Sequence, residues 1–227
     1  MNILLTIAVT FFAGMGAGLG TGFAGMSAAA VISPMLITFL KMDPYMAVGI
    51  ALSSDVLASA VSAYIYGKNK NLDIKNGIIM MISVLTFTVV GSYIASLLPA
   101  ATMGSFSVFM TFLLGIKFIV RPVMTTKEAM QGVSAKKRAI QSVVCGIMIG
   151  LICGFVGAGG GMMMLLILTS VLGYELKTAV GTSVFIMAFT AFTGAVSHFM
   201  IVGAPDWTVF ILCVVFTLIW ARRCCFI

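Results

Sequence analysis

Residues Ile152–Met162 read ICGFVGAGGGM, and an earlier stretch, Gly20–Ala30, reads GTGFAGMSAAA. Shifting the chain by 132 residues without a gap superposes these stretches, and it also superposes AVGIALSSD (Ala47–Asp55) on AVGTSVFIM (Ala179–Met187). The register gives twelve identities between positions 14 and 66, five of them glycines. A chance likeness of two Gly-rich apolar stretches would not also reproduce the order and spacing of both motifs. The sequence therefore predicts two homologous repeats.

Long uncharged stretches surround these motifs. The first charged side chain is Lys41, and residues 76–116 and 139–174 carry no charge. Each stretch exceeds the roughly 20 residues that span a bilayer. The chain is 61% apolar and only 8% charged, with a mean hydropathy of +1.19, which excludes an ordinary soluble domain. Continuous apolar runs also argue against a transmembrane barrel, whose strands alternate polar and apolar residues. We expect an all-α, polytopic membrane protein of the cell membrane that retains its apolar N-terminus.

The apolar runs predict how each repeat is laid out. The first repeat covers residues 1–120, a cytoplasmic linker covers 121–138, and the second repeat covers 139–227. The predicted membrane segments are, in order, Ile3–Leu40, Tyr45–Tyr66, Ile78–Leu97, Met103–Val120, Ala139–Leu172, Thr178–Met200 and Trp207–Trp220. The second repeat therefore lacks a counterpart of the last helix of the first repeat.

The opening segment of each repeat is too long for one membrane helix. The 38 residues of Ile3–Leu40 would form a helix of about 57 Å, nearly twice the hydrocarbon thickness. A glycine cluster lies near the middle of each opening segment, where the backbone breaks most readily, so we expect two half-helices that meet there. If each segment is a hairpin, the two repeats are inverted, and twelve Lys and Arg residues lie inside against one outside. If each segment crosses the membrane fully, nine Lys and Arg residues lie inside and four outside. The positive-inside rule favours the model with more of these residues inside, which is the inverted one.

A helix break inside the membrane can bind an anion. The half-helix that follows the break presents unpaired N–H groups and the positive end of its dipole. The residues predicted to line this site are Gly157, Gly159, Gly160 and Gly161 in the second repeat, facing Gly25 and Ser27 in the first. Glycines leave the approach open, and the hydroxyl of Ser27 adds a donor. Two such half-helices meeting head to head could enclose one small anion.

Other glycines are spaced by four residues, which is typical of close helix packing. They are Gly14, Gly18 and Gly22 in the first repeat and Gly146, Gly150 and Gly154 in the second. For these six we favour packing over binding. Gly157 to Gly161 are too dense for such a pattern and poor for a helix, so for them a functional break is the stronger interpretation.

Two motifs recur in both halves of the chain. GFVGAGGGMMM at 154–164 is followed by AVGTS at 179–183, and the diverged copy GTGFAGMSAAAVISP at 20–34 is followed by AVG. Together they resemble the sulfite exporter TauE/SafE family of membrane permeases. The resemblance implies a duplicated permease for small organic or inorganic anions, often sulfur-containing ones such as sulfite or sulfonates. It further implies that Gly157, Gly159, Gly160, Gly161, Thr182 and Ser183 form the site in the second half. In the first half, Met26–Ala29 replaces the glycine-rich run.

Polar residues inside the predicted spans need an explanation. Asp55 lies near the middle of its span, where an ionised carboxylate costs about 2.5 to 3.5 kcal/mol. It is a candidate for coupling, because a carboxyl group can carry a proton with or against the anion. The alternatives are a partner such as Lys117 or a depth nearer the interface. Thr182 and Ser183, with Ser53 and Ser54 on the equivalent segment, offer hydroxyls either to substrate oxygens or to helix carbonyls.

Other classes of function fit less well. The Lys and Arg residues fall between apolar runs, so they indicate loops inside the cell and no nucleic-acid surface. The chain contains no HExxH or CxxC pattern and no His cluster, and we expect no metal, cofactor or enzymatic activity. Ser183 and His198 would be about 22 Å apart on one helix, which excludes a serine protease pair. An anion channel and a nontransporting scaffold stay open as alternatives. We predict a permease for small anions that works by alternating access at the repeat interface. A proton or a cation is the candidate coupling ion, and whether the protein is a monomer or a homo-oligomer stays open.

Overall fold

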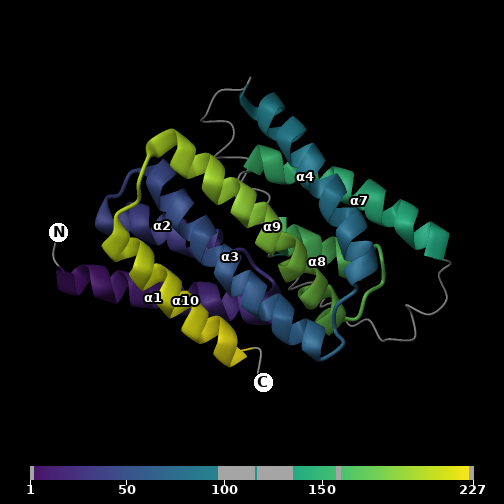
Figure 1. Ribbon diagram of the computed structural model, residues 1–227, viewed down its shortest axis with the longest axis horizontal. Coiled ribbons are helices and arrows are strands. Elements are labelled where there is room, and N and C mark those ends of the chain that lie inside the picture. The colour runs from purple at the N-terminus through teal and green to yellow at the C-terminus, as the bar shows by residue number, and fades with distance from the viewer. Residues whose placement is uncertain (1–2, 97–115, 117–134, 157–159, 225–227) are drawn as a thin grey trace.

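The computed structural model describes residues 3–96, 116, 135–156 and 160–224, and every regular element in these ranges is a helix. In chain order the helices are α1 (Ile3–Ala24), α2 (Ala29–Leu40), α3 (Pro44–Lys68), α4 (Ile74–Ser96), α7 (Ala135–Val156), α8 (Gly160–Ser170), α9 (Leu176–Val202) and α10 (Trp207–Cys224). The all-α class is thus confirmed (Figure 1). The span predicted at 103–120 lies outside the described residues except for residue 116, and α7 begins inside the end of the predicted linker.

The helix bounds follow the repeat found in the sequence. Helices α1 and α7 differ by 132 residues at both ends, and the starts of α3 and α9 differ by the same number. Lys41 (φ 55°) and Gly173 (φ 66°), also 132 positions apart, both take the left-handed conformation after α2 and α8. In both turns the next N–H donates to the carbonyl six residues earlier in the chain. The two halves of the chain therefore fold as equivalent units.

The outer helices of each repeat pack against helices of the other repeat, and α3 and α9 form the central pair between them. Helix α1 packs against α10 of the other repeat, and α7 packs in the same way against α4. The central helices α3 and α9 are antiparallel (Figure 1): Gly194 of α9 lies against Leu52 near the start of α3, whereas Gly181 lies against Tyr66 near its end. This pair of equivalent helices thus points in opposite directions, and inversion of the whole repeats stays a prediction. The orientation of each repeat in the bilayer stays a prediction.

Glycines spaced by four bring the outer helices of the two repeats close together. A Cβ added to Gly18 would lie 2.6 Å from the carbonyl oxygen of Thr217 on α10, and one added to its equivalent, Gly150, 2.6 Å from a carbonyl oxygen of α4. Gly14 and Gly146 approach the same two helices almost as closely. Real Cβ atoms do not pack at such distances, so any larger residue would push the helices apart. The predicted packing role is confirmed for these four glycines.

Helices α2 and α8 have half the length of a membrane helix. Their 12 and 11 residues correspond to about 18 and 16 Å, against roughly 30 Å of hydrocarbon. Helix α1 has 22 residues, which corresponds to about 33 Å. It is therefore longer than the half-helix that was predicted. Its glycines pack against α10 and stay within the helix, because the close contact with α10 favours a regular backbone there. Within the described residues, Ile3–Ala24, Met46–Lys68 and Leu176–Val196 are long and apolar enough to cross a membrane.

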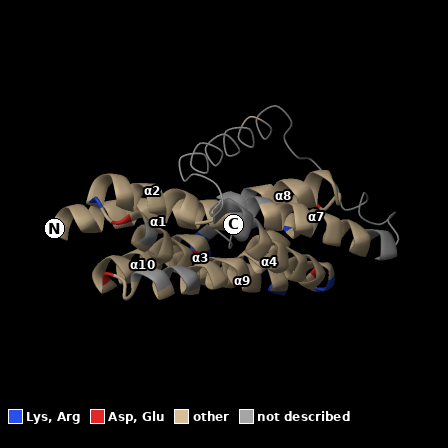
Figure 2. Cartoon of the chain, turned by 90° about the horizontal axis from the view of Figure 1, so that it is seen from above, with Lys and Arg blue, Asp and Glu red and all other residues tan. Residues whose placement is uncertain are grey.

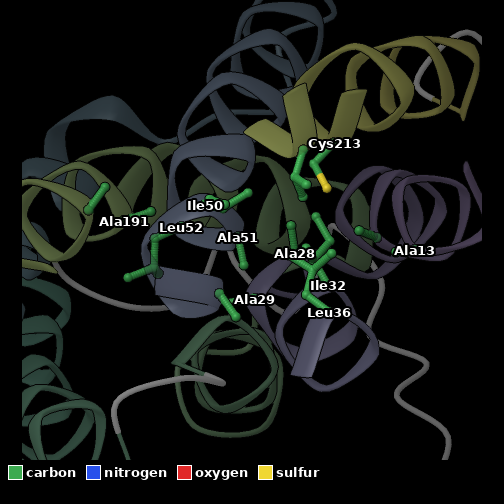
Figure 3. Packing of buried hydrophobic residues seen from close by; sticks show 14 of the residues in the cluster. Ala13, Ala28, Ala29, Ile32, Leu36, Ile50, Ala51, Leu52, Ala191 and Cys213 are labelled. Carbon is green, nitrogen blue, oxygen red and sulfur yellow. The ribbon is translucent and has the colours of Figure 1, made fainter. Parts of the chain in front are cut away.

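Helix α2 is enclosed by other helices, whereas the outer faces of the molecule are apolar. Ile32 and Leu36 of α2 belong to one buried cluster with Ala13 of α1, Ala51 of α3 and Cys213 of α10 (Figure 3). Large apolar side chains such as those of Phe12, Ile82 and Phe192 are more than half exposed on the outside. Charged residues lie mainly toward the two ends of the molecule (Figure 2). This distribution suits a protein whose middle is surrounded by lipid.

Acidic residues mark the places where helices begin. Asp43, Asp73 and Asp206 directly precede α3, α4 and α10, and each accepts a hydrogen bond from a backbone N–H of the following turn. A carboxylate at this position satisfies a free N–H and stabilises the helix dipole. Glu175 directly precedes α9. Of the acidic residues that the structure describes, only Asp55 lies inside a helix.

Candidate functional site

The break in the first repeat lies between α1 and α2. Gly25 ends α1 with a φ of +58°, a conformation that glycine adopts without strain. The N–H of Met26 then donates back to a carbonyl of α1, and the hydroxyl of Thr21 donates a 2.9 Å hydrogen bond to the carbonyl of Met26. The hydroxyl of Ser27 accepts a 3.3 Å hydrogen bond from the N–H of Ala29, where α2 begins. The predicted helix break is confirmed here, and the binding role of Gly25 and Ser27 stays a prediction.

Asp55 of α3 lies at the start of α2. Its side chain is fully buried, and it accepts a 2.6 Å hydrogen bond from the hydroxyl of Ser27 and a 3.0 Å bond from that of Ser59. The N–H of Ala28, the N-cap of α2, also interacts with the carboxyl group. The carboxyl group of the protein itself therefore occupies the positive end of α2, a place suited to an anion. Ser59 was not among the predicted residues, although its position one helical turn after Asp55 could have identified it.

The first turn of α8 lies directly against the break of the first repeat. A Cβ added to Gly161 would collide with the carbonyl oxygen of Gly25 and the sulfur of Met187. The same atom would lie 3.1 Å from the backbone nitrogen of Ser27. The start of α8 and the α1–α2 break are therefore in contact, and no side chain fits at position 161.

Ser183 lies beside the contact between α8 and the α1–α2 break, whereas Thr182 lies beside the connection between α3 and α4. A Cβ added to Gly25 would collide with Oγ of Ser183, and the Ser183 hydroxyl donates a 2.9 Å hydrogen bond to the carbonyl of Val180. Oγ1 of Thr182 accepts a 3.3 Å hydrogen bond from the N–H of Asp73, directly before α4. Thr182 thus holds the α3–α4 connection against α9. The roles of both hydroxyls toward a substrate stay predictions.

The other predicted residues fall into two groups. Gly160 is the first residue of α8, whereas Gly157, Gly159 and Lys117 lie outside the described residues. Ser53 and Ser54 donate to the carbonyls of Gly49 and Ile50 in their own helix, which is the back-bonding that was the alternative to a substrate contact. Within the described part of the chain, no group of three or more His, Cys, Asp or Glu side chains could hold a metal ion.

The starts of the two short helices differ in charge. The residue equivalent to Asp55 in the second repeat is Met187, whose sulfur lies beside Gly161. The start of α2 therefore faces a carboxyl group, whereas the start of α8 faces an uncharged thioether. The first N–H groups of any helix lack partners within it, and they attract anions. At the start of α8, Met187 takes the place that Asp55 has at the start of α2, and it brings no carboxyl group to the positive end of the helix.

Comparisons with known proteins identify the family of the chain. The family model described as sulfite exporter TauE/SafE matches residues 10–222. Two proteins of Bacillus subtilis (strain 168) are similar to the chain. The probable membrane transporter protein YunE is 26% identical over 203 residues, covering 84% of this chain and 74% of its own. The probable membrane transporter protein YdhB is 24% identical over 185 residues, covering 80% and 74%.

No solved structure matches the chain. The family match covers both glycine motifs, and the two relatives are named as probable membrane transporters, not as enzymes. The resemblance drawn from the paired glycine motifs is thereby confirmed. The chain belongs to the sulfite exporter TauE/SafE family, and it is an integral membrane transporter.

Proposed function

We propose that this protein is a secondary transporter that carries small anions across the cell membrane by alternating access. Its binding site is the place where the first turn of α8 meets the break between α1 and α2. The observation that carries the proposal is the contact of Gly161, in the first turn of α8, with the carbonyl of Gly25 and the backbone nitrogen of Ser27. At this point two short helices begin among helices that are otherwise apolar, which is how discontinuous helices form substrate sites in transporters.

The chemistry of the site favours a small anion as substrate. The N–H groups of the first turn of α8 have no partner within the helix and form the positive end of its dipole, and Gly160 and Gly161 put no side chain in the way. The hydroxyls of Ser27 and Ser183 lie close by. They donate to Asp55 and to the carbonyl of Val180, so each would turn from that acceptor to donate to the oxygen of an oxyanion. The description of the family names sulfite export, so sulfite is the first candidate, ahead of sulfonates and carboxylates.

The arrangement of the repeats supports alternating access. Helices α3 and α9 are equivalent and antiparallel, and the α1–α2 and α7–α8 pairs lie in opposite halves of the molecule (Figures 1 and 2). In multi-pass transporters with inverted repeats, the rocking of one repeat against the other opens a central site to each side in turn. Asp55, the acidic residue that lies inside a helix in the described part of the chain, carries a proton with or against the anion.

Uptake into lipid vesicles tests the proposal. Purified protein is reconstituted, and uptake of labelled sulfite, a sulfonate and a carboxylate is measured with and without a proton gradient. We expect saturable uptake of at least one of these anions. Gly161→Val should abolish it, because the added side chain fills the contact with Gly25 and Met187. The matched control is Gly20→Ala, whose Cβ would meet only Met26 at an ordinary 3.5 Å.

Three results would contradict the proposal. Flux that rises without saturation would indicate a channel, since a carrier has a limited number of sites. Absence of flux for every anion would indicate a protein that does not transport them. Uptake that is equal in Gly161→Val and the native protein would show that the substrate binds elsewhere.

A further inference from the structure

Four polar side chains form a row along one face of α3, and we propose that this row conducts a proton between Asp55 and the end of the helix at Lys68. The row consists of Asp55, Ser59, Ser62 and Tyr66, which are four, three and four residues apart. Residues at these spacings lie above one another on a single face of a helix. The inference rests on the proposed function, because it gives the coupling proton of that function a route.

The row is buried where it begins and partly exposed where it ends. Asp55, Ser59 and Ser62 are 0% exposed, and the hydroxyl of Ser59 donates a 3.0 Å hydrogen bond to Asp55. Tyr66, near the end of α3, is partly exposed, and its hydroxyl donates a 2.9 Å hydrogen bond to the carbonyl of Gly22. A hydroxyl can accept one hydrogen bond while it donates another, so each member of the row can pass a proton to the next.

Ser62 is the member of the row whose buried hydroxyl has no hydrogen bond within its own helix. Its hydroxyl is buried and has no hydrogen-bond partner among the described residues. Other serines of α3 differ from it, since Ser54 donates to its own helix and Ser59 to Asp55. A buried polar group without a partner is a site where an ordered water can bridge to its neighbours. Such a water would connect Ser59 with Tyr66 through Ser62.

The second repeat shows that helix packing does not require this polarity. In the order of the row, the equivalents of Asp55, Ser59, Ser62 and Tyr66 are Met187, Ala191, Gly194 and His198. These residues belong to α9, which packs against α3 in the centre of the molecule. Small or apolar residues therefore satisfy the first three positions in an equivalent helix, and the carboxyl group of Asp55 and the hydroxyls of Ser59 and Ser62 need another explanation.

Few other titratable groups near Asp55 could take up the proton. Helices α1, α2 and α8 contain no titratable side chain. On the other helices packed around it, the described titratable groups are the exposed Lys177 of α9, the buried thiol of Cys213 and the exposed Arg222 and Arg223 of α10, and, on α3 itself, the exposed Tyr64 and Lys68 and the partly exposed Tyr66 of the row. The side chains of Tyr45, His198 and Cys224 lie outside the described part. Asp55 is thus the buried carboxyl group of this region.

Infrared difference spectroscopy follows the proton without a transported substrate. With purified protein in lipid vesicles, lowering the pH should produce a protonated-carboxyl band that is absent from Asp55→Asn. In heavy water this band shifts at the rate at which deuterium reaches Asp55. We expect Ser59→Ala and Ser62→Ala each to slow the shift about tenfold, which corresponds to about 1.4 kcal/mol on the barrier. Ser54→Ala is the matched control, because Ser54 is a buried serine of α3 outside the row, and it should exchange like the native protein.

Two results would overturn the inference. The first is an exchange rate that is unchanged in both Ser59→Ala and Ser62→Ala, and the second is the absence of an Asp55 band at every pH. Ser62→Gly, which copies the second repeat, provides a second variant if Ser62→Ala does not fold. The measurement uses no anion. Failure of the proton route is therefore distinguishable from failure of the proposed anion transport.

Discussion

The hydroxyl of Ser27 donates a 2.6 Å hydrogen bond to Oδ2 of Asp55, and this bond joins the break before α2 to the middle of α3. Both side chains are buried, and they are 28 residues apart in the chain. A buried carboxyl group is tolerated only where donors replace the lost water. The conformation of the helix break and the burial of the carboxyl group therefore depend on each other. Substitution of either residue should change the stability contributed by the other.

Replacing Ser27 by Ala tests this dependence. The substitution leaves Asp55 without its shortest hydrogen bond, so we expect the free energy of unfolding to fall by about 1 to 3 kcal/mol. Denaturant titration in detergent measures the change. The same substitution in an Asp55→Asn background should cost less, because the neutral amide is less costly to leave unpaired. Equal losses in both backgrounds would show that the two side chains are not coupled.

Replacing Asp55 by Asn separates coupling from binding. Asn has nearly the same size and still accepts from Ser27, but it carries no exchangeable charge. We expect accumulation of labelled sulfite driven by a proton gradient to fall to background, while exchange of sulfite at equal concentrations on both sides persists. Accumulation at the native level would contradict coupling at this residue. Loss of both activities together with an unchanged thermal midpoint would instead place Asp55 in the anion site.

Replacing Gly18 by Ala tests the packing between the two repeats. The new Cβ would lie 2.6 Å from the carbonyl oxygen of Thr217, and such overpacking costs about 1 to 3 kcal/mol. Gly20→Ala, two residues away in the same helix, meets Met26 only at 3.5 Å. It should raise stability by up to about 1 kcal/mol, because Ala favours a helix over Gly. Thermal midpoints in detergent compare the two variants, and a Gly18→Ala midpoint equal to that of Gly20→Ala would contradict the close approach of α1 and α10.

Much of the fold could be predicted because apolar runs and glycine clusters report on it directly. The predicted opening segment Ile3–Leu40 starts where α1 starts and stops where α2 stops, and the predicted span Tyr45–Tyr66 lies within α3. The pairing of α1 with α10 could not be predicted, because no local pattern tells which of several apolar helices a given helix will meet. It depends on the path of the whole chain.

The site was harder to predict because adjacent residues of a helix point in different directions. Thr182 and Ser183 are neighbours in the AVGTS motif, but successive positions of an α-helix are about 100° apart around its axis. Ser183 therefore borders the break at Gly25, whereas the hydroxyl of Thr182 holds the N–H of Asp73. The sequence places both residues on the right helix but leaves the rotation of that helix open.

Gly25 is subject to two separate constraints, and a set of alanine variants distinguishes them. Its φ of +58° costs Ala about 1 to 2 kcal/mol, and its Cβ would also collide with Oγ of Ser183. Gly173→Ala measures the first cost alone, because Gly173 has a φ of +66° and nothing within 4 Å of an added Cβ. We expect Gly25→Ala to lower the thermal midpoint further than Gly173→Ala does.

Adding Ser183→Ala to Gly25→Ala should recover the difference between the two single variants. Removal of the hydroxyl leaves the Cβ of Ser183 at 3.7 Å from the new methyl group, which is an ordinary contact. The cost of the left-handed backbone stays, so the double variant should match Gly173→Ala and not the native protein. If the double variant is no more stable than Gly25→Ala, the crowding at the break comes from the backbone of α9, and Ser183 then lies farther from Gly25 than the structure has it.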